Sequence, residues 1–428
     1  MTADPAAEGT TRALVLHPDI RSDPARRAPG PALAEAVALA AALPRLAIAG
    51  AETVPLPKPR AGWLFGSGKL EELKARIAAA EAELVLIDGP VTPVQQRNLE
   101  KHWGVKVLDR TGLILEIFAD RARTREGVLQ VDLAALAYQR TRLVRSWTHL
   151  ERQRGGLGFV GGPGETQIEA DRRAIDEQMM RLRRQLAKVS QTRGLHRAAR
   201  ARTPWPVVAL VGYTNAGKST LFNQLTGAEV LAKDMLFATL DPTMRALRLP
   251  SGQEVIMSDT VGFISALPTQ LVAAFRATLE EVLEADLVVH VRDIAHPDSE
   301  AQADDVRAIL AELGLGAAQT EGMIEVWNKI DALPEAEADA LRGRAARLDG
   351  VVVASALSGE GLDALQAMIA ARLPEPVQEE DLDLGFGEGR RRAWLFAQGV
   401  VLSEARGEDG HHLHVRWTGA QKARFARL

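Results

Sequence analysis

Cysteine does not occur in the 428-residue chain, and its absence excludes a disulfide framework and any metal site built on thiolates. Long apolar runs are also missing. The best candidate, residues 31–42, contains Glu35, is followed by Pro44 and falls short of the about 18 residues that a membrane-spanning helix needs. The first residues show neither the basic nor the apolar region of a signal peptide. We therefore expect a cytoplasmic protein with no membrane span.

Charge is distributed unevenly along the chain, although the net charge is only −4. Residues 140–203 hold 15 Lys and Arg against 6 Asp and Glu, a net charge of +9, which leaves −13 for the rest of the chain. A basic block on an otherwise acidic chain indicates a polyanionic partner.

The length suggests about three domains, and we expect residues 1–11, ahead of the first domain, to be disordered. In residues 12–129, strand patterns alternate with amphipathic helical patterns, which is typical of a small α/β unit with a parallel sheet. The expected extended segments are 12–16, 46–55, 83–88 and 105–109, and the expected helices are 33–43, 68–82, 92–103 and 111–122.

The residue pattern changes in 130–203, where two helical patterns, 130–153 and 165–189, flank a glycine-rich stretch. They predict a helical hairpin with polar, arginine-rich faces that projects from the body of the protein. Its tip would expose Leu157, Phe159 and Val160, which favours a contact surface. A solvated coiled coil with a passive turn is the alternative.

A phosphate-binding loop follows the hairpin, with the pattern G-x-x-x-x-G-K-S between an apolar strand and the start of a helix. A strand, a loop and a helix N-terminus in this order place successive backbone N–H groups around an anion. Lys218 would reach the β- and γ-phosphates, and the Ser219 hydroxyl would bind Mg²⁺. The predicted nucleotide contacts of this segment are Gly212, Tyr213, Thr214, Asn215, Ala216, Gly217, Lys218, Ser219 and Thr220.

Two later segments match the parts of a nucleotide switch. Thr239 could add a second hydroxyl to Mg²⁺ when a γ-phosphate orders its loop. Asp259 opens an Asp-x-x-Gly pattern at the end of a strand; it would hold a Mg²⁺-bound water, and the Gly262 amide would sense the γ-phosphate. The predicted contacts here are Phe237, Ala238, Thr239, Leu240, Asp241, Asp259, Thr260, Val261 and Gly262.

An Asn-Lys-x-Asp pattern after a further strand indicates how the base is recognised. Asp331 can accept hydrogen bonds from the N1–H and 2-amino groups of guanine, while Asn328 would support the loop and the O6/N7 edge. Adenine lacks both donors, so the pattern predicts GTP and GDP rather than ATP. The Ala356 amide, after the next strand, could meet guanine O6. The predicted contacts are Asn328, Lys329, Ile330, Asp331, Ser355, Ala356 and Leu357.

These motifs, each at or just after a strand, predict a P-loop GTPase domain in residues 204–373, built on a doubly wound mixed sheet. Ras-like enzymes place a water-positioning Gln directly after Asp-x-x-Gly, but this chain has Phe263 there, whose side chain cannot hydrogen-bond. Asn215 resembles the asparagine of potassium-stimulated GTPases, so K⁺ could supply positive charge beside the phosphates. The candidate catalytic residues are Lys218, Asn215, Thr239 and Gly262.

Residues 374–428 predict a linker, the acidic and glycine-rich stretch 375–389, and a small C-terminal α/β domain. A strand–turn–strand and a short final helix are expected in that domain. His411, His412 and His414 suggest a metal, but only His412 and His414 would share a face of a strand. Two ligands without a third do not favour a metal site.

The sequence resembles the HflX family of translational GTPases over nearly its whole length. The resemblance rests on the phosphate loop, on residues 234–243 and 259–264, and most specifically on the glycine-rich block that ends Gly161-Gly-Pro-Gly-Glu-Thr-Gln167. It implies an N-terminal domain with an α/β part and a helical part, a GTPase domain and a small C-terminal α/β domain. It also implies a protein that binds the rRNA and proteins of the large ribosomal subunit, reaches toward the peptidyl transferase region and splits stalled ribosomes under stress. We expect the protein to be a monomer.

Two other functions stay open at this point. One is a GTP-dependent RNA maturation or modification factor, and the other is a regulatory GTPase that docks a protein on its hairpin. The resemblance also implies ATP binding by the N-terminal domain, for which Gly66-Ser-Gly-Lys69 is a candidate segment. This segment lacks the G-x-x-x-x-G-K spacing, and a turn that caps the next helix is the alternative.

Overall fold

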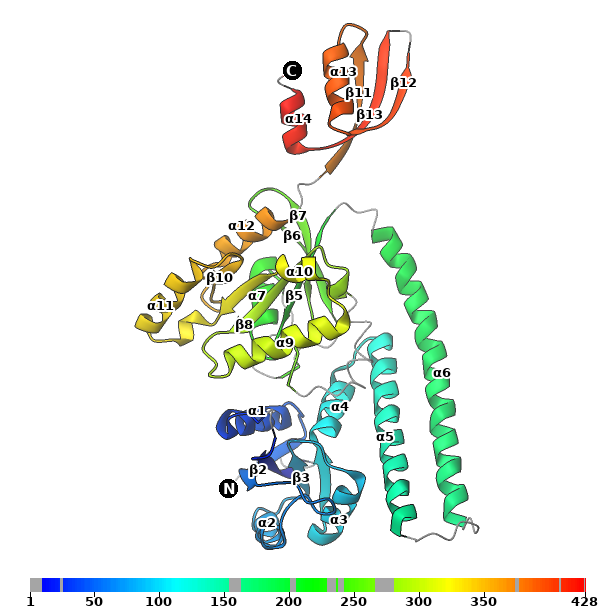
Figure 1. The fold of residues 1–428 in the computed structure, drawn as a ribbon, viewed down its shortest axis with the longest axis vertical. Coiled ribbons are helices and arrows are strands. Elements are labelled where there is room, and N and C mark those ends of the chain that lie inside the picture. Colours follow the sequence, from blue (N-terminus) through cyan, green and yellow to red (C-terminus); the bar gives the residue numbers. More distant parts are fainter. Residues whose placement is uncertain are drawn as a thin grey trace, which may run out of the picture.

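The computed structural model describes residues 10–23, 26–153, 163–200, 205–228, 236–237, 242–265, 281–373, 377–407, 409–426 and 428. Within these ranges the strands form three sheets, of four, six and three strands, which follow one another along the long axis of the molecule (Figure 1). Of the segment expected to be disordered, residues 1–9 lie outside these ranges. None of the helices in the described ranges is long and apolar enough to cross a membrane.

The first sheet belongs to the N-terminal α/β unit, and its four strands are parallel in the order β2-β1-β3-β4. The predicted alternation of strands and helices is confirmed, but β1 is longer than expected and α1 starts earlier, with a proline in its first turn. The elements are β1 (Thr11–Ile20), α1 (Pro29–Ala41), β2 (Leu46–Leu56), α2 (Ser67–Ala79), β3 (Leu84–Ile87), α3 (Pro93–Trp103), β4 (Lys106–Asp109) and α4 (Arg110–Arg121).

The hairpin consists of the long helices α5 (Arg125–Gln153) and α6 (Pro163–Arg200), which pack side by side (Figure 1). Both are longer than predicted, because α5 starts before residue 130 and α6 continues past residue 189. The first turns of α5 bury Leu129, Val131 and Ala134, and α5 packs on α3 and α4, so the base of the hairpin belongs to the core of the N-terminal unit. The described residues do not include the hairpin tip with Leu157, Phe159 and Val160.

The second sheet has the order β10-β9-β8-β5-β7-β6, with β6 antiparallel to β7 and the other pairs parallel. It is the mixed sheet predicted for a P-loop GTPase domain. Its strands are β5 (Val207–Gly212), β6 (Thr243–Arg248), β7 (Glu254–Asp259), β8 (Leu287–Asp293), β9 (Ile324–Asn328) and β10 (Val351–Val353). Its helices are α7 (Lys218–Thr226), α9 (Ser299–Leu313), α10 (Ala317–Glu321), η1 (Ile330–Ala332), α11 (Glu335–Ala345) and α12 (Leu362–Arg372).

Both faces of this sheet are buried at its central strands, which explains why β5 and β8 are mostly apolar. On β5, Ala209 and Val211 belong to the same apolar cluster as Val306 of α9, whereas Val208 and Leu210 share a second cluster with α7 and α12. Because β10, β9, β8, β5 and β7 are parallel, their carboxyl ends lie at one edge of the sheet, where ligands of such sheets bind.

The third sheet is antiparallel, in the order β11-β13-β12, and forms the C-terminal domain. Its elements are β11 (Val377–Gly385), α13 (Gly389–Ala397), β12 (Val401–Arg406), β13 (Gly410–Thr418) and α14 (Gly419–Phe425). The prediction of a linker over 375–389 is wrong for most of this stretch, because it forms β11.

Cross-strand pairing explains how an acidic segment becomes a strand. Asp383 lies opposite His412 and binds it, and Asp381 binds His414 at 2.7 Å, while Leu384 faces the buried core. The histidines are therefore paired with carboxylates across the sheet. Among the described residues, no group of three or more His, Cys, Asp or Glu is placed to hold a metal ion.

Candidate functional site: a phosphate loop braced by two neighbouring loops

The phosphate loop leaves β5 at Gly212 and ends where α7 begins at Lys218. Gly212 has a φ of 153° and Gly217 a φ of 92°, which residues with a side chain rarely adopt. A Cβ atom on Gly212 would overlap the Val291 carbonyl of β8, and one on Gly217 would overlap the Asn328 side chain. The two glycines therefore allow the loop to lie directly against its neighbours.

The Lys218 ammonium group lies inside this loop. Its Nζ donates to the carbonyl oxygens of Gly212 at 3.1 Å and Tyr213 at 2.9 Å, and the residue is only 6% exposed. Burial lowers the pKa of Lys218 to about 8, although the Asp259 carboxylate acts in the opposite direction. A phosphate anion in the loop would favour the charged ammonium, so the lysine is well placed to bind one.

Two oxygen-bearing side chains meet next to the lysine. Ser219, in the first turn of α7, donates from Oγ to Oδ2 of Asp259 at 2.7 Å, and Asp259 is fully buried at the end of β7. Hydroxyl and carboxylate oxygens are ligands that Mg²⁺ prefers, so this donor set fits the predicted metal site. Thr260 has a different role, because its Oγ1 donates to the Leu210 carbonyl at 2.6 Å.

The Asp-x-x-Gly segment is attached to the phosphate loop by backbone hydrogen bonds. The Thr214 amide donates to the Phe263 carbonyl at 2.7 Å, and the Phe263 amide donates to the Gly212 carbonyl at 3.0 Å. A Cβ atom on Gly262 would lie 2.9 Å from both Lys218 Nζ and Thr214 Cα, so the position has no room for a side chain. Gly262 therefore lies against the predicted phosphate site, and the Phe263 side chain is buried and apolar.

The loops predicted to bind the base are joined to the phosphate loop by Asn328. Its Nδ2 donates to the Ala216 carbonyl at 2.8 Å, and its Oδ1 accepts from the Ala356 amide at 2.9 Å. Asn328 is 1% exposed. The side chain thus supports the loops, as predicted, and in this structure the Ala356 amide is hydrogen-bonded to Asn328.

The remaining residues of the predicted base site lie at the same edge of the sheet. Lys329 has a φ of 67° and its Nζ binds the Asp293 carboxylate at 2.8 Å, while Ile330 is buried beneath it. Ser355 is buried and its Oγ accepts from the Ser358 amide at 3.0 Å. Asp331 and Leu357 are exposed, so the Asp331 carboxylate is accessible to a base.

The predicted switch segment around Thr239 is described only at Phe237. Phe237 has a φ of 56°, is 2% exposed and packs edge to face on Phe118 of α4, with ring centroids 4.6 Å apart. Sequence reasoning missed this contact, because no local pattern connects the two rings. Ala238, Thr239, Leu240 and Asp241 lie outside the described residues.

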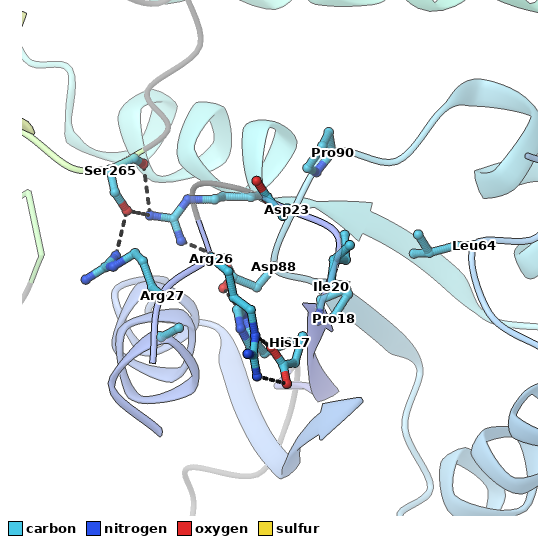
Figure 2. A pocket seen from close by; sticks show the side chains of 14 residues that line it. His17, Pro18, Ile20, Asp23, Arg26, Arg27, Leu64, Asp88, Pro90 and Ser265 are labelled. Atoms are coloured by element: carbon cyan, nitrogen blue, oxygen red, sulfur yellow. Dashed lines mark hydrogen bonds and ion pairs between the residues drawn. The ribbon is translucent and has the colours of Figure 1, made fainter. Parts of the chain in front are cut away.

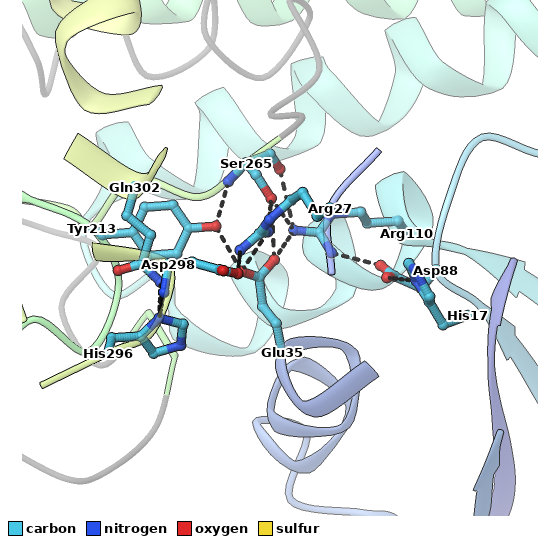
Figure 3. A network of polar contacts seen from close by, with 10 residues as sticks. All are labelled: His17, Arg27, Glu35, Asp88, Arg110, Tyr213, Ser265, His296, Asp298 and Gln302. Atoms are coloured by element: carbon cyan, nitrogen blue, oxygen red, sulfur yellow. Dashed lines mark hydrogen bonds and ion pairs between the residues drawn. The ribbon is translucent and has the colours of Figure 1, made fainter. Parts of the chain in front are cut away.

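A polar network between the N-terminal unit and the GTPase domain was also missed (Figure 3). Glu35 of α1 lies at its centre and contacts Tyr213 of the phosphate loop and Ser265, which follows the Asp-x-x-Gly segment. Arg27 binds Glu35 at 3.0 Å and Asp298 at 3.1 Å. These residues lie far apart in the sequence, and only the fold brings them together.

A cavity of about 170 Å³ opens at the carboxyl ends of β1 and β3 in the N-terminal unit (Figure 2). The strand order of the sheet reverses there, which is a common place for ligands. Two of the arginines in its wall are neutralised within the protein, because Arg26 binds Asp19 at 2.5 and 2.8 Å and Arg110 binds Asp88 at 2.5 Å.

The segment considered for ATP starts a helix. Gly66 is the N-cap residue of α2, and Lys69 Nζ binds the carboxylates of Glu52 at 2.5 Å and Glu72 at 2.9 Å. Because the lysine is held by two carboxylates, the structure favours the helix-start interpretation of this segment.

Comparisons with known proteins cover the chain almost from end to end. Four family models match in order: GTP-binding GTPase N-terminal at residues 31–119, GTP-binding GTPase Middle Region at 121–200, 50S ribosome-binding GTPase at 207–329 and HflX C-terminal domain at 340–428. The GTPase HflX of Magnetococcus marinus is 50% identical over 85% of this chain and 83% of its own length. The GTPase HflX of Escherichia coli is 44% identical over the same shares of the two chains.

Among solved structures, a GTP-binding protein from Sulfolobus solfataricus in complex with GDP is 23% identical, with a TM-score of 0.44 over 85% of this chain and 98% of that one. The family models and the curated relatives decide the assignment, because they agree over most of the chain. The chain therefore belongs to the HflX family, and it is a GTPase that binds guanine nucleotides and hydrolyses GTP.

Proposed function

We propose that this GTPase acts on ribosomes, where it binds the large subunit through its basic hairpin and splits stalled ribosomes. The observation that carries the proposal is the surface of α6, a helix of 38 residues. The side chains of Arg173 and Arg181 are 78% and 73% exposed, and each pairs with a glutamate one turn away on the same helix. Exposed pairs of this kind contribute little stability, so the arginines are available to phosphate oxygens of rRNA.

The nucleotide site supports GTP with Mg²⁺. The phosphate loop and Lys218 would hold the phosphates, and Asp331 would accept from guanine. The side chains that would hold Mg²⁺ are Ser219, Thr239 and, through water, Asp259. Mg²⁺ in such a site neutralises charge on the β- and γ-phosphate oxygens. The Gly262 amide, adjacent to Lys218, would distinguish GTP from GDP.

Hydrolysis in this proposal does not use the side chain after Asp-x-x-Gly. Phe263 is 2% exposed and its backbone forms a bridge with Tyr213, so its role is to position the Asp-x-x-Gly segment against the loop. Asn215 has a φ of 61° within the loop, beside the predicted phosphates. We propose that Asn215 helps to hold K⁺, whose charge would stabilise the negative charge of the transition state.

Pelleting with purified large subunits at several salt concentrations tests the role of the hairpin. Replacing Arg181, Arg183 and Arg184 with alanine should weaken binding and lower the slope of log K against log salt by about 2–3, because each lost phosphate contact removes about 0.7–0.9. The matched control replaces Arg342 and Arg344 of α11 and Arg347 just after that helix, which removes the same charge outside the hairpin. Equal effects of both triple variants would contradict a specific role for α6.

Light scattering of intact ribosomes with GTP tests splitting. The double variant Phe159→Ala with Gly161→Val changes the hairpin tip and should bind large subunits nearly as well while losing splitting, since phosphate contacts position a protein and do not choose its site. Normal splitting by this variant would contradict a role of the tip in splitting and would favour the interpretation of the tip as a passive turn. Binding to short structured RNA instead of subunits would favour RNA maturation, and binding to neither would favour a protein partner. The monomeric state and cytoplasmic location stay predictions.

A further inference from the structure

Three segments of the predicted phosphate machinery in the GTPase domain contact the N-terminal α/β unit, in addition to Asp298, which binds Arg27. Tyr213 is in the phosphate loop, Phe237 is in the switch segment of Thr239, and Ser265 follows the Asp-x-x-Gly segment. Their partners are Glu35 of α1 and Phe118 of α4. Segments that respond to a γ-phosphate are therefore packed directly on a different part of the molecule.

The Glu35 carboxylate joins two of these segments (Figure 3). Its Oε2 accepts from the Tyr213 hydroxyl at 2.7 Å and from Arg27 at 3.0 Å, and its Oε1 accepts from the Ser265 hydroxyl at 3.2 Å and from Arg110. The Tyr213 hydroxyl in turn accepts from the Ser265 amide at 2.8 Å. Glu35, Tyr213 and Ser265 thus form a closed ring of contacts between two domains.

The ring depends on a buried charge. The Glu35 side chain is 9% exposed, and burial raises its pKa, but the positive charges of Arg110 and Arg27 outweigh this effect and hold the pKa below its ordinary value. Arg110 continues to Asp88 at 2.5 Å, and Asp88 to His17 at 2.8 Å. Tyr213 and Ser265 are neutral donors to this buried carboxylate, so a movement of either one removes a hydrogen bond to a charged group, which is a costly loss.

The second contact uses the rings of Phe118 and Phe237. Their edge-to-face packing, with centroids 4.6 Å apart, places the switch segment on α4, and both residues are buried in one apolar cluster that spans the two domains. Close-packed contacts of this kind change between discrete arrangements rather than deforming gradually. A shift of the segment at Phe237 must therefore be accompanied by a change at α4.

The hairpin is connected to α4 through Asp109. Asp109 caps the start of α4 by accepting from the Gly112 amide at 2.9 Å. The same carboxylate accepts from Tyr138 at 2.5 Å and Arg142 at 2.6 Å, both on α5. The helices α4 and α5 therefore share one buried anchor, and α5 continues from it into the hairpin.

We propose that Glu35 is a positioning residue that couples the nucleotide in the GTPase domain to the orientation of the hairpin. The contacts of Phe118 with Phe237, and of Asp109 with α5, complete the connection. The inference rests on the guanine nucleotide site and not on the ribosome. Such coupling is reciprocal. If exchanging GDP for GTP changes the affinity of the hairpin for its partner by some factor, the partner changes the ratio of the affinities for GDP and GTP by the same factor.

Spin-label distance measurements on the full chain test this coupling. The chain contains no cysteine, so Gln178→Cys on α6 and Ala311→Cys on α9, two exposed positions, carry the labels without background reaction. We expect the distance distribution to shift when GDP is exchanged for a non-hydrolysable GTP analogue. Glu35→Gln should abolish the shift, and the ratio of affinities for the two nucleotides should change at least about fivefold, the lower bound of typical coupling.

Glu52→Gln is the matched control. Glu52 also receives two cations, Lys69 at 2.5 Å and Arg76 at 2.6 Å, but these partners belong to the N-terminal unit. The Glu52→Gln variant should therefore keep the nucleotide-dependent shift in the spin-label distance. Tyr213→Phe removes one hydroxyl from the ring and should reduce the shift, which keeps the test decisive if Glu35→Gln does not fold.

The outcomes separate this inference from the nucleotide assignment. Wild-type protein that binds GDP and the analogue but shows no shift would overturn the coupling alone, as would a full shift in both Glu35→Gln and Tyr213→Phe. Loss of the shift in Glu52→Gln as well would show a general effect of weakening the N-terminal unit and would also overturn it. Failure of the wild-type chain to bind either nucleotide would overturn the nucleotide site on which the inference rests.

Discussion

Replacing Asn328 with alanine removes both hydrogen bonds that connect the phosphate loop with the loop of Ala356. The partners lost are the Ala216 carbonyl and the Ala356 amide, each bonded to the same buried side chain. A buried polar group left without a partner costs about 1–3 kcal/mol, so the two together cost about 2–6 kcal/mol. In the free protein the loops can relax toward water, but a bound nucleotide holds them in place, so much of the cost falls on the complex.

A cost of about 3 kcal/mol in the complex corresponds to a loss of about 100-fold in affinity. We expect this loss for GDP, GTP and xanthosine triphosphate alike, because Nδ2 and Oδ1 of Asn328 are both hydrogen-bonded to the two loops. The assay is a fluorescence titration with labelled nucleotides, combined with urea unfolding to verify that the variant is folded. Unchanged affinity for GTP would refute the bracing role. A loss confined to guanine nucleotides would show that Asn328 contacts the base.

The remaining predictions concern the base, the cation and the lysine. Asp331→Asn should weaken GTP binding by about 2–3 kcal/mol and improve binding of xanthosine triphosphate, because the new amide can donate to the extra carbonyl; unchanged GTP affinity in a titration would exclude base recognition by Asp331. Asn215→Ala should leave GTP binding largely intact and abolish any stimulation of GTP hydrolysis by K⁺ over Na⁺. Equal wild-type hydrolysis rates in both salts, with and without ribosomes, would argue against the potassium site. The nucleotide-free protein should gain up to about 3 kcal/mol of stability as pH rises from about 8 to 10.5, because the unfolded chain keeps the Lys218 proton over this range while the folded protein releases it. Below pH 8 the lysine is charged in both states, so the gain vanishes there. Lys218→Met should lack the gain, and parallel stability curves for the variant and wild type would contradict the effect of burial.

The sequence alone predicted the P-loop domain because its signals are local. A strand buried on both faces is apolar along its length, as in Val207–Gly212, and a phosphate loop needs glycine at particular backbone positions. Gly212 and Gly217 have the positive φ values that such positions require. Helix and strand periodicity likewise predicted the alternation of the N-terminal unit, whose helix starts shifted by a few residues because capping decides the ends.

Local signals misled at β11 for a physical reason. Glu379, Asp381 and Asp383 lower the strand propensity of the segment, and only the histidines and arginine of β13, opposite them in the sheet, make a strand favourable. The sequence shows both partners but not that they are neighbours.

Tertiary structure decided which residues act together around the nucleotide. Asn328 joins Ala216, 112 positions away, to Ala356, and Glu35 reaches Tyr213 across 178 positions. The motif predicted that Asn328 supports its loop, but only the fold identifies Ala216 and Ala356 as its partners. The Glu35 contact follows from no periodicity or motif, since it depends on how two domains pack. The motifs determined that this chain handles GTP, whereas the packing of α1 and α4 decided which distant residues contact the phosphate loop and the switch segment.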